Sequence, residues 1–273
     1  MGGKRLLGSA LILGLGIYLA GIAVLYVNQR RFLFVGSIRP GAQPATPPGY
    51  SDVRLAAADG TMLRAWYKAP VRGKPVVMFF HGNGDTIAGS AVAVRPFVAR
   101  GYGVLLPEYR GYGGMPGKPS EDTSASDART AHSWLTTQGL DDGQIVVIGY
   151  SLGAGVATQL ATEIHPCALI LFAAFASVDH VAAAKLPIVP VRWLLTEHFD
   201  NEAKLSSVAA PILLLHGTAD RTVPYDNLGR LKRARRDATA VTFSHVDHSI
   251  VFQSAPVERA LTWLESLPKP APL

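Results

Sequence analysis

Short hydrophobic runs alternate with stretches of helical length from Asp52 to the end of the chain. Two runs, 53–57 and 63–68, flank Asp59-Gly60, a dipeptide that favours a tight turn between paired strands. The other runs are apolar throughout and are bounded by turn-forming or polar residues; they are 76–80, 104–106, 145–148, 168–172, 212–215 and 240–243. Continuous apolar strands of this kind are typical of a parallel sheet that is buried on both faces.

The stretches between these runs predict helices, which cover 89–100, 120–137, 152–164, 226–236 and 255–266. We therefore expect an α/β fold with an eight-stranded, mostly parallel sheet and helices on both faces. One segment breaks the alternation. Residues 177–204 are largely apolar but are interrupted by Pro187 and Pro190, so we expect a small helical flap inserted there rather than a simple crossover.

The N-terminal segment has a different hydrophobic pattern. The 22 residues from Leu6 to Val27 contain no charge, and a helix of that length spans about 33 Å, enough to cross a bilayer. Tyr26 lies near the end of the run, and Arg30 and Arg31 follow it. A cleaved signal peptide is the alternative, but its apolar region is only about 7–15 residues long. The pattern favours an uncleaved, single-pass transmembrane anchor.

These patterns divide the chain into five parts. Residues 1–5 form a short basic end, 6–27 the anchor, 28–50 a Pro- and Gly-rich linker, 51–267 one α/β domain that includes the flap, and 268–273 a loose tail. We expect the linker to be an extended spacer that holds the domain off the membrane. Lys4 and Arg5 on one side nearly balance Arg30, Arg31 and Arg39 on the other. The positive-inside rule therefore leaves the topology open, with the extracytoplasmic side favoured for the domain.

Net charge first suggests an acidic partner, because 26 lysines and arginines against 20 acids give +6 over 273 residues. However, five of the basic residues lie in 1–51, which contains no acid; removing those five from the 26 leaves 21 against the 20 acids. The charge is better explained by membrane flanking than by nucleic-acid binding. The single cysteine, Cys167, excludes an intramolecular disulfide and a multi-cysteine metal site. Neither a metal nor an organic cofactor is implied, and the oligomeric state stays undetermined.

A candidate nucleophile lies between a strand and a helix, in the sequence Gly149-Tyr150-Ser151-Leu152-Gly153. This G-x-S-x-G pattern places a serine on a sharp turn above the sheet, where flanking glycines leave room for the turn. The backbone N–H of Leu152 then opens a helix, so it can stabilise negative charge on a bound carbonyl oxygen.

A second glycine-rich turn, His81-Gly82-Asn83-Gly84, follows the strand at 76–80. In this architecture the corresponding loop supplies the second oxyanion donor, a backbone N–H. Asn83 is the candidate, whereas His81 is better interpreted as a buried structural histidine.

The base and the acid are expected late in the chain if the order is Ser, Asp, His. His245 and His248 both lie in the loop after the last strand, and we favour His248 because it directly precedes the final helix. Asp220 follows the preceding strand and is the candidate acid. Asp226 fits better as a helix cap, and Asp247 is too close to His248 in the chain to reach its far ring nitrogen easily.

Combined, the motifs resemble the α/β-hydrolase superfamily. They are HGNGD (81–85), EYRGYGG (108–114), PSEDTSASDA (119–128), GYSLGAG (149–155), HGTADRTVP (216–224) and the HVDHS loop. The chain is most similar to membrane-anchored and membrane-associated serine hydrolases, a group that includes protein depalmitoylases, over residues 50–267. The resemblance implies that Ser151, Asp220 and His248 are nucleophile, acid and base, and that Asn83 and Leu152 form the oxyanion hole.

The chain departs from the family pattern at three points. Glu108 stands where the family often has Asp, and Asp247 stands where Gly often precedes the base. The N-terminal segment also lacks the cysteines that attach the depalmitoylases of this group to membranes.

The sequence thus predicts a membrane-tethered serine hydrolase that cleaves carboxylic esters or thioesters through an acyl-serine intermediate. The apolar flap favours a small-molecule or lipid-like substrate with an apolar acyl chain. An amidase or peptidase with the same triad, and a non-catalytic binding protein of the same fold, are the alternatives.

Overall fold

The computed structural model describes residues 2–38 and 41–268, so Arg39 and most of the predicted tail lie outside the described residues. Its eight strands form one sheet in the order β1-β2-β4-β3-β5-β6-β7-β8. Pairings β1–β2 and β2–β4 are antiparallel, and the others are parallel, which confirms the predicted eight-stranded, mostly parallel sheet. The strands are β1 (Ser51–Ala56), β2 (Met62–Lys68), β3 (Val76–Phe80), β4 (Gly103–Pro107), β5 (Ile145–Tyr150), β6 (Ala168–Phe172), β7 (Ile212–Gly217) and β8 (Thr239–Phe243).

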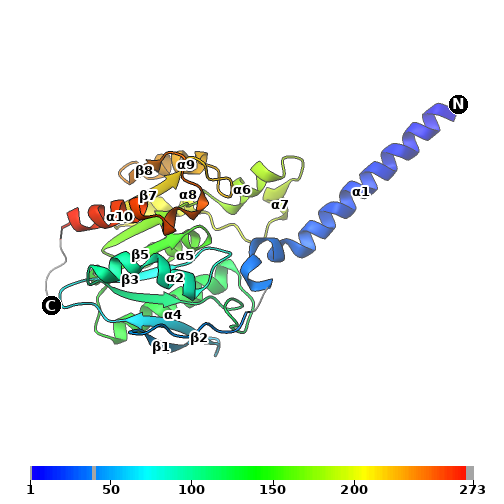
Figure 1. Cartoon of the computed structure of the whole chain (residues 1–273). Coiled ribbons are helices and arrows are strands. Elements are labelled where there is room, and N and C mark those ends of the chain that lie inside the picture. Colours follow the sequence, from blue (N-terminus) through cyan, green and yellow to red (C-terminus); the bar gives the residue numbers. More distant parts are fainter. Residues whose placement is uncertain (1, 39–40, 269–273) are drawn as a thin grey trace.

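Helices cover both faces of this sheet (Figure 1). One face carries α2 (Ile87–Ala93), α3 (Arg95–Ala99) and α10 (Ser254–Ser266), whose apolar residues share one core cluster. The other carries α4 (Glu121–Thr137), α5 (Leu152–Ala161) and α9 (Asp226–Ala234), which share a second cluster. Side chains of β3 divide between the two clusters in alternation, as a strand buried on both faces requires: Val76, Met78 and Phe80 enter one, and Val77 and Phe79 the other.

Short 3₁₀ turns join several of these elements; they are η1 (Val35–Ile38), η2 (Asp142–Gln144), η3 (Leu205–Ser207) and η4 (His248–Phe252). The helix predicted at 89–100 is in fact two short helices that meet at Val94. Pro96 explains the break, because proline has no N–H to donate to the carbonyl four residues earlier. By contrast, α4 is continuous and starts with a capping box between Ser120 and Thr123.

The N-terminal helix, α1 (Gly2–Leu33), projects away from the domain (Figure 1). Within the part of the chain that the structure describes, it is the one helix long and apolar enough to cross a membrane, over Leu6–Leu33. The end of α1 that is next to the domain is packed against it. Phe34 directly follows the helix and is buried in the core, where its ring contacts that of Phe199 with centroids 6.3 Å apart.

The segment at 28–50 differs from the expected extended spacer. Its first residues continue α1, and its later residues lie against the sheet, where the Pro44 carbonyl accepts a 2.8 Å hydrogen bond from Arg64. The Thr46 hydroxyl accepts a further 3.2 Å hydrogen bond from the same guanidinium. Through the buried Phe34 and these polar contacts, the segment packs on the domain and holds it close to α1.

The flap contains three short helices: α6 (Val178–Lys185), α7 (Val191–Leu194) and α8 (Asn201–Lys204). Pro187 and Pro190 both lie in the turn between α6 and α7. The flap leaves the domain beside α1, on the same side of the molecule (Figure 1).

Candidate active site

Ser151 occupies the turn between β5 and α5, with a backbone φ of +52° and ψ of −116°. A positive φ is unfavourable for a residue with a side chain and persists only where its surroundings impose it. Here the Ser151 N–H donates a 3.0 Å hydrogen bond to the Phe172 carbonyl on β6. This turn lifts the hydroxyl above the carboxyl ends of the parallel strands.

Two glycines leave the space for the turn. A Cβ on Gly153 would lie 2.0 Å from the Phe80 carbonyl oxygen on β3, and one on Gly149 would lie 2.5 Å from the carbonyl oxygen of Gly153. Both obstacles are backbone atoms, which cannot swing aside as a side chain can. The spacing of the G-x-S-x-G pattern is therefore a packing requirement of this strand–turn–helix junction.

The structure brings together Ser151, His248 and Asp220, three candidate residues from separate parts of the chain. His248 Nε2 lies 3.0 Å from Ser151 Oγ, and its Nδ1 lies 2.7 Å from Asp220 Oδ2. The Asp220 side chain is fully buried, whereas that of His248 is 22% exposed. Since a carboxylate can only accept, His248 carries its proton on Nδ1 and offers the Nε2 lone pair to the Ser151 hydroxyl.

Asp220 is held by several donors. Its Oδ1 accepts hydrogen bonds from the backbone N–H groups of Thr222 and Val223, at 2.8 and 2.9 Å. Burial on its own would raise the pKa of Asp220, but hydrogen bonds from His216 and His248 outweigh burial and hold that pKa well below its usual range. Asp220 is thus a fixed carboxylate that orients the imidazole.

Tyr150 and His216 belong to this arrangement, although no sequence motif assigned either of them a role in it. The Tyr150 hydroxyl donates a 3.0 Å hydrogen bond to the His248 carbonyl, and its ring lies 5.3 Å from the His248 ring, centroid to centroid. His216 Nε2 lies 3.4 Å from Asp220 Oδ2 and 3.0 Å from the Val223 carbonyl. The available signals were a tyrosine beside the serine and a histidine four residues before the acid.

Asn83 and Leu152 line the same cavity as Ser151. Within the described residues, neither the Leu152 N–H at the start of α5 nor the Asn83 N–H in the loop after β3 has a hydrogen-bond acceptor. Unpaired donors at a helix N-terminus suit an anionic oxygen. The Asn83 side chain is occupied otherwise: it donates to the Leu33 carbonyl at 2.5 Å and accepts from the Tyr112 hydroxyl at 2.7 Å.

His81 lies below this loop and is fully buried. Its Nε2 lies 2.9 Å from Glu108 Oε1, and the other carboxylate oxygen of Glu108 accepts from the Ile87 N–H at 2.9 Å. Burial lowers the pKa of His81, but the charge and hydrogen bond of Glu108 raise it more, so the net shift is upward. This pair fastens the loop that carries Asn83 to the start of α2.

The other candidates for the base and the acid, His245, Asp247 and Asp226, make different contacts. His245 has a positive φ of 61°, and its N–H bonds to Thr218. Asp247 accepts a 2.9 Å hydrogen bond from the Ser249 N–H. The interpretation of Asp226 as a helix cap is wrong: Tyr225 is the N-cap of α9, and Asp226 pairs with His180 of the flap at 2.7 Å instead.

A cavity of about 550 Å³ leads to Ser151. Its wall is formed by the site, by the flap and, unexpectedly, by α1, which contributes Leu25, Tyr26, Gln29, Phe32 and Leu33. Among the described residues, none that lines the cavity is a carboxylate, and Lys185 is the one charged residue. In the same described part of the chain, no group of three or more metal-ligating side chains is found.

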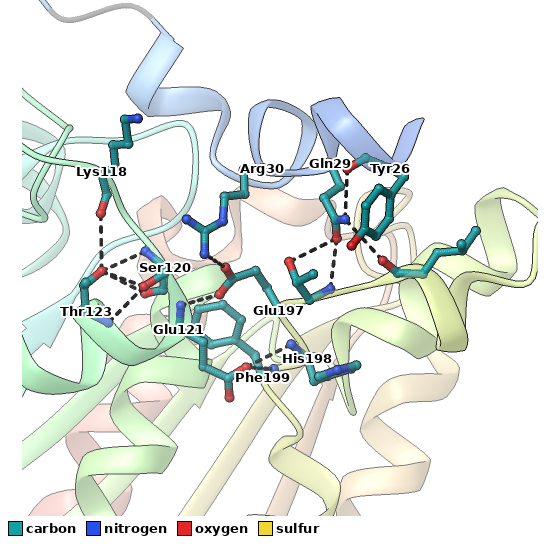
Figure 2. A network of polar contacts seen from close by, with 12 residues as sticks. Tyr26, Gln29, Arg30, Lys118, Ser120, Glu121, Thr123, Glu197, His198 and Phe199 are labelled. Atoms are coloured by element: carbon teal, nitrogen blue, oxygen red, sulfur yellow. Dashed lines mark hydrogen bonds and ion pairs between the residues drawn. The ribbon is translucent and has the colours of Figure 1, made fainter. Parts of the chain in front are cut away.

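Polar contacts fix α1 to the flap (Figure 2), and two of the residues involved, Gln29 and Leu194, also line the cavity. Arg30 forms a 2.7 Å ion pair with Glu197, whose side chain is buried and also accepts a 2.5 Å hydrogen bond from the Glu121 N–H at the start of α4. Gln29 donates to the Leu194 carbonyl at 3.2 Å and accepts from the Thr196 N–H at 2.9 Å. Contacts near the polar, C-terminal end of α1 therefore hold the part of this helix that forms the cavity wall.

Comparisons with known proteins place the chain in a family. A family model described as "Serine aminopeptidase, S33" matches residues 72–203. The α/β-hydrolase domain-containing protein WAV2 of Arabidopsis thaliana is 32% identical over 246 residues, which cover 79% of each chain. Lysophosphatidylserine lipase ABHD12 of Rattus norvegicus is 30% identical over 186 residues, which cover 60% of this chain and 46% of that protein.

Solved structures agree on the fold. An esterase from Pyrococcus furiosus superimposes with a TM-score of 0.66 at 19% identity, covering 84% of this chain and 97% of that one. The sheet order and these relatives confirm the resemblance drawn from the motifs, and the enzyme class that they support is a hydrolase. The chain belongs to the α/β-hydrolase superfamily.

Proposed function

We propose that the protein is a membrane-tethered serine hydrolase that cleaves carboxylic esters or thioesters of apolar acyl chains. The observation that carries the proposal is the relay from Asp220 through His248 to Ser151 at the base of an apolar cavity. Ser151 is the nucleophile, His248 the general base and then the general acid, and Asp220 the group that orients the imidazole.

The reaction proceeds in two halves. Ser151 Oγ attacks the substrate carbonyl while its proton passes to His248 Nε2, and the N–H groups of Asn83 and Leu152 stabilise the resulting oxyanion. His248 then protonates the departing alcohol or thiol, which leaves an acyl-serine ester. Water, deprotonated by His248, attacks that ester and releases the carboxylic acid and free Ser151. Each oxyanion donor is worth about 3–4 kcal/mol of barrier.

The cavity wall supports an acyl chain rather than a peptide as the occupant. An aminopeptidase must bind the cationic amino group of its substrate, for which a carboxylate is the natural partner. None of the described lining residues is acidic, and most are aliphatic or aromatic. Peptide or amide hydrolysis is nevertheless the second candidate, because the matching family model is described as a serine aminopeptidase.

Labelling with a fluorophosphonate probe tests the serine mechanism. The natural chain should be labelled, Ser151→Ala should not, and the matched control Ser133→Ala, at an exposed position on α4, should be labelled normally. A second matched pair tests the base: activity should be lost in His248→Ala and retained in His245→Ala. Folded protein without Ser151-dependent labelling would favour a non-catalytic binding protein and overturn the proposal.

A series of p-nitrophenyl esters from acetate to palmitate, together with a leucine p-nitroanilide, tests the substrate class. The rate should rise with chain length until the cavity is filled, and the anilide should be a poor substrate. A preference for acetate would contradict the apolar acyl chain, and a preference for the anilide would favour a peptidase. The extracytoplasmic position of the domain stays a prediction, which protease accessibility in intact cells tests.

A further inference from the structure

The tip of the flap, residues 186–193, lies alongside the membrane-spanning part of α1 (Figure 1). The Tyr18 hydroxyl donates a 2.6 Å hydrogen bond to the Ile188 carbonyl. Tyr18 is near the middle of the uncharged run from Leu6 to Val27. A tyrosine hydroxyl at such a depth needs a partner, because leaving it unpaired in hydrocarbon is costly, and the flap supplies that partner.

The position of Tyr18 gives the depth of the flap tip. Asn28, the first strongly polar residue after the run, lies ten positions further along the helix, or about 15 Å at 1.5 Å per residue. Half of a bilayer's hydrocarbon layer is about 15 Å thick. With Asn28 at the interface, the contact to Ile188 falls near the bilayer midplane for an upright helix, and about 11 Å deep at the large tilt of 40°.

The flap tip has a composition that suits this depth. Trp193 is 90% exposed, Ile188 78% and Leu186 39%, although all three are apolar. No carboxylate occurs between Asp179 and Glu197. The two cations of the segment, Lys185 and Arg192, have long aliphatic stems that let their charged ends reach lipid phosphates.

Part of the tip's backbone is paired internally, as a lipid environment favours. The N–H groups of Leu186, Val189, Val191 and Trp193 donate to flap carbonyls at 2.7–3.1 Å. Pro187 and Pro190 have no N–H to satisfy.

From these contacts we infer that the flap tip inserts into the same bilayer as α1, so that the cavity opens inside the hydrocarbon layer. The cavity reaches from Ser151 to Leu186 on the flap and to Leu25 and Tyr26 on α1. An acyl chain can then pass from the bilayer to Ser151 between α1 and the flap. This inference rests on the proposed membrane tether, and it adds that the anchor and the flap together form the substrate's entrance.

Quenching of tryptophan fluorescence by brominated lipids tests the insertion without reference to catalysis. The full chain is reconstituted in phosphatidylcholine vesicles, with or without lipids brominated at defined acyl positions. Trp66, Trp134 and Trp263 lie on β2, α4 and α10, within the domain. We expect strong quenching in the natural chain, most of it lost in Trp193→Phe. Equal quenching in the two proteins would overturn the inference. So would the absence of quenching in both, which includes the case in which a second copy covers Trp193.

An activity measurement tests the entrance. Trp193 does not line the cavity, so Trp193→Asp should leave hydrolysis of water-soluble p-nitrophenyl acetate unchanged. A buried charge opposes insertion, so the rate on a long-chain ester embedded in vesicles should fall on the order of tenfold or more. Val71 is 64% exposed on the loop between β2 and β3, at the amino end of β3 and so at the opposite end of the strands from Ser151. It provides the matched control Val71→Asp, for which both rates should be unchanged.

These readouts separate the inference from the functions on which it rests. If the hydrolase proposal is wrong, the natural chain will show no Ser151-dependent labelling. The quenching of Trp193 by brominated lipids can still be measured in that case. Equal loss of both rates in Trp193→Asp, or loss of neither, would overturn the entrance while labelling stays intact.

Discussion

At the scale of single residues, the site depends on backbone space as much as on reactive groups. Ser151 at φ +52° stores strain of about 1–3 kcal/mol. Its neighbours hold it there because α5 approaches β3 so closely that only glycine fits at position 153. The position of Ser151 is therefore set by the contact between a helix and a strand, and it opposes the backbone preference of a serine residue.

Gly153→Ala tests this dependence. The added Cβ would lie 2.0 Å from the Phe80 carbonyl oxygen, so α5 must move and carry the Leu152 N–H with it. We expect a loss of about 1–3 kcal/mol in the free energy of unfolding and a large loss of activity. Gly143→Ala is the matched control, because its Cβ would meet nothing within 4 Å. Denaturation in detergent and fluorophosphonate labelling measure the two effects; a fully active, stable Gly153→Ala variant would contradict the argument.

The sequence allowed Ser151, Asp220 and His248 to be predicted because each follows a strand end in a fixed order. It could not reveal His216 or Tyr150 as their neighbours. His216 ends β7 like any strand residue, and only the turn at 218–223 brings its ring back to Asp220. The four-residue spacing between His216 and Asp220 is a weak signal, and only the folded structure shows that the two side chains are in contact.

Asp220→Asn tests the orienting role of the carboxylate. An amide in this position can donate to His248 Nδ1 and so favour the tautomer that leaves Nε2 protonated and unable to accept the serine proton. We expect kcat to fall about 10⁴-fold with little change in fold. Asp247→Asn is the matched control, since its carboxylate faces Ser249, and it should retain most of its activity. Steady-state kinetics decide; near-natural kcat in Asp220→Asn would remove the residue from the mechanism.

At the scale of elements, the strands were predictable and the linker was not. Runs such as 76–80 and 168–172 match β3 and β6 because a strand buried on both faces is apolar throughout. The segment after Val27 looked like a spacer, since prolines and glycines are the local signal of an extended chain. Its packing depends on Phe34 meeting Phe199, a residue of the flap, and on Arg64 meeting Pro44. Such distant partners override the local preference.

Glu121→Gln tests the junction of α4 with the flap. Burial raises the pKa of Glu121, but hydrogen bonds from Lys204 and from the N–H groups of Phe199 and His198 lower it more, to a net value below the ordinary 4.5. A lowered pKa means that the carboxylate's contribution to stability is complete above pH 4.5 and is lost as the pH falls through the lowered value.

The Gln variant should therefore be about 1–2 kcal/mol less stable than the natural chain at pH 7, and the difference should narrow towards pH 3. Thermal or denaturant unfolding in detergent at several pH values measures it. Glu258→Gln, which removes an exposed partner of Arg100, should change stability by no more than about 0.5 kcal/mol at any pH. A Glu121→Gln difference that is constant with pH would mean that the carboxylate charge is not involved.

At the scale of the whole molecule, charge and hydrophobicity are divided along the chain. Some of the domain's cations are paired within it: Arg110 pairs with Asp59 and Asp127, and Arg230 pairs with Glu202. The excess of cations over acids comes mainly from residues 1–51, on either side of the apolar run of α1, whose side chains from Leu6 to Val27 are mostly exposed. Two modes of membrane attachment are thus distinguishable: electrostatic attraction of a basic protein, and insertion of an apolar helix.

Washing of membranes separates the two modes, because molar salt shortens the Debye length to about 3 Å and releases proteins held by charge alone. We expect the full chain to stay in the membrane pellet after washes with molar salt and with alkaline carbonate. Leu13→Arg combined with Leu15→Arg places two charges near the centre of the span, each costing about 2.5–3.5 kcal/mol, and should shift the chain towards the soluble or aggregated fractions. Val71→Arg adds the same side chain on the exposed surface of the domain and should leave retention unchanged. Release of the natural chain by salt alone would assign its attachment to the flanking arginines, and α1 would then not be a transmembrane span.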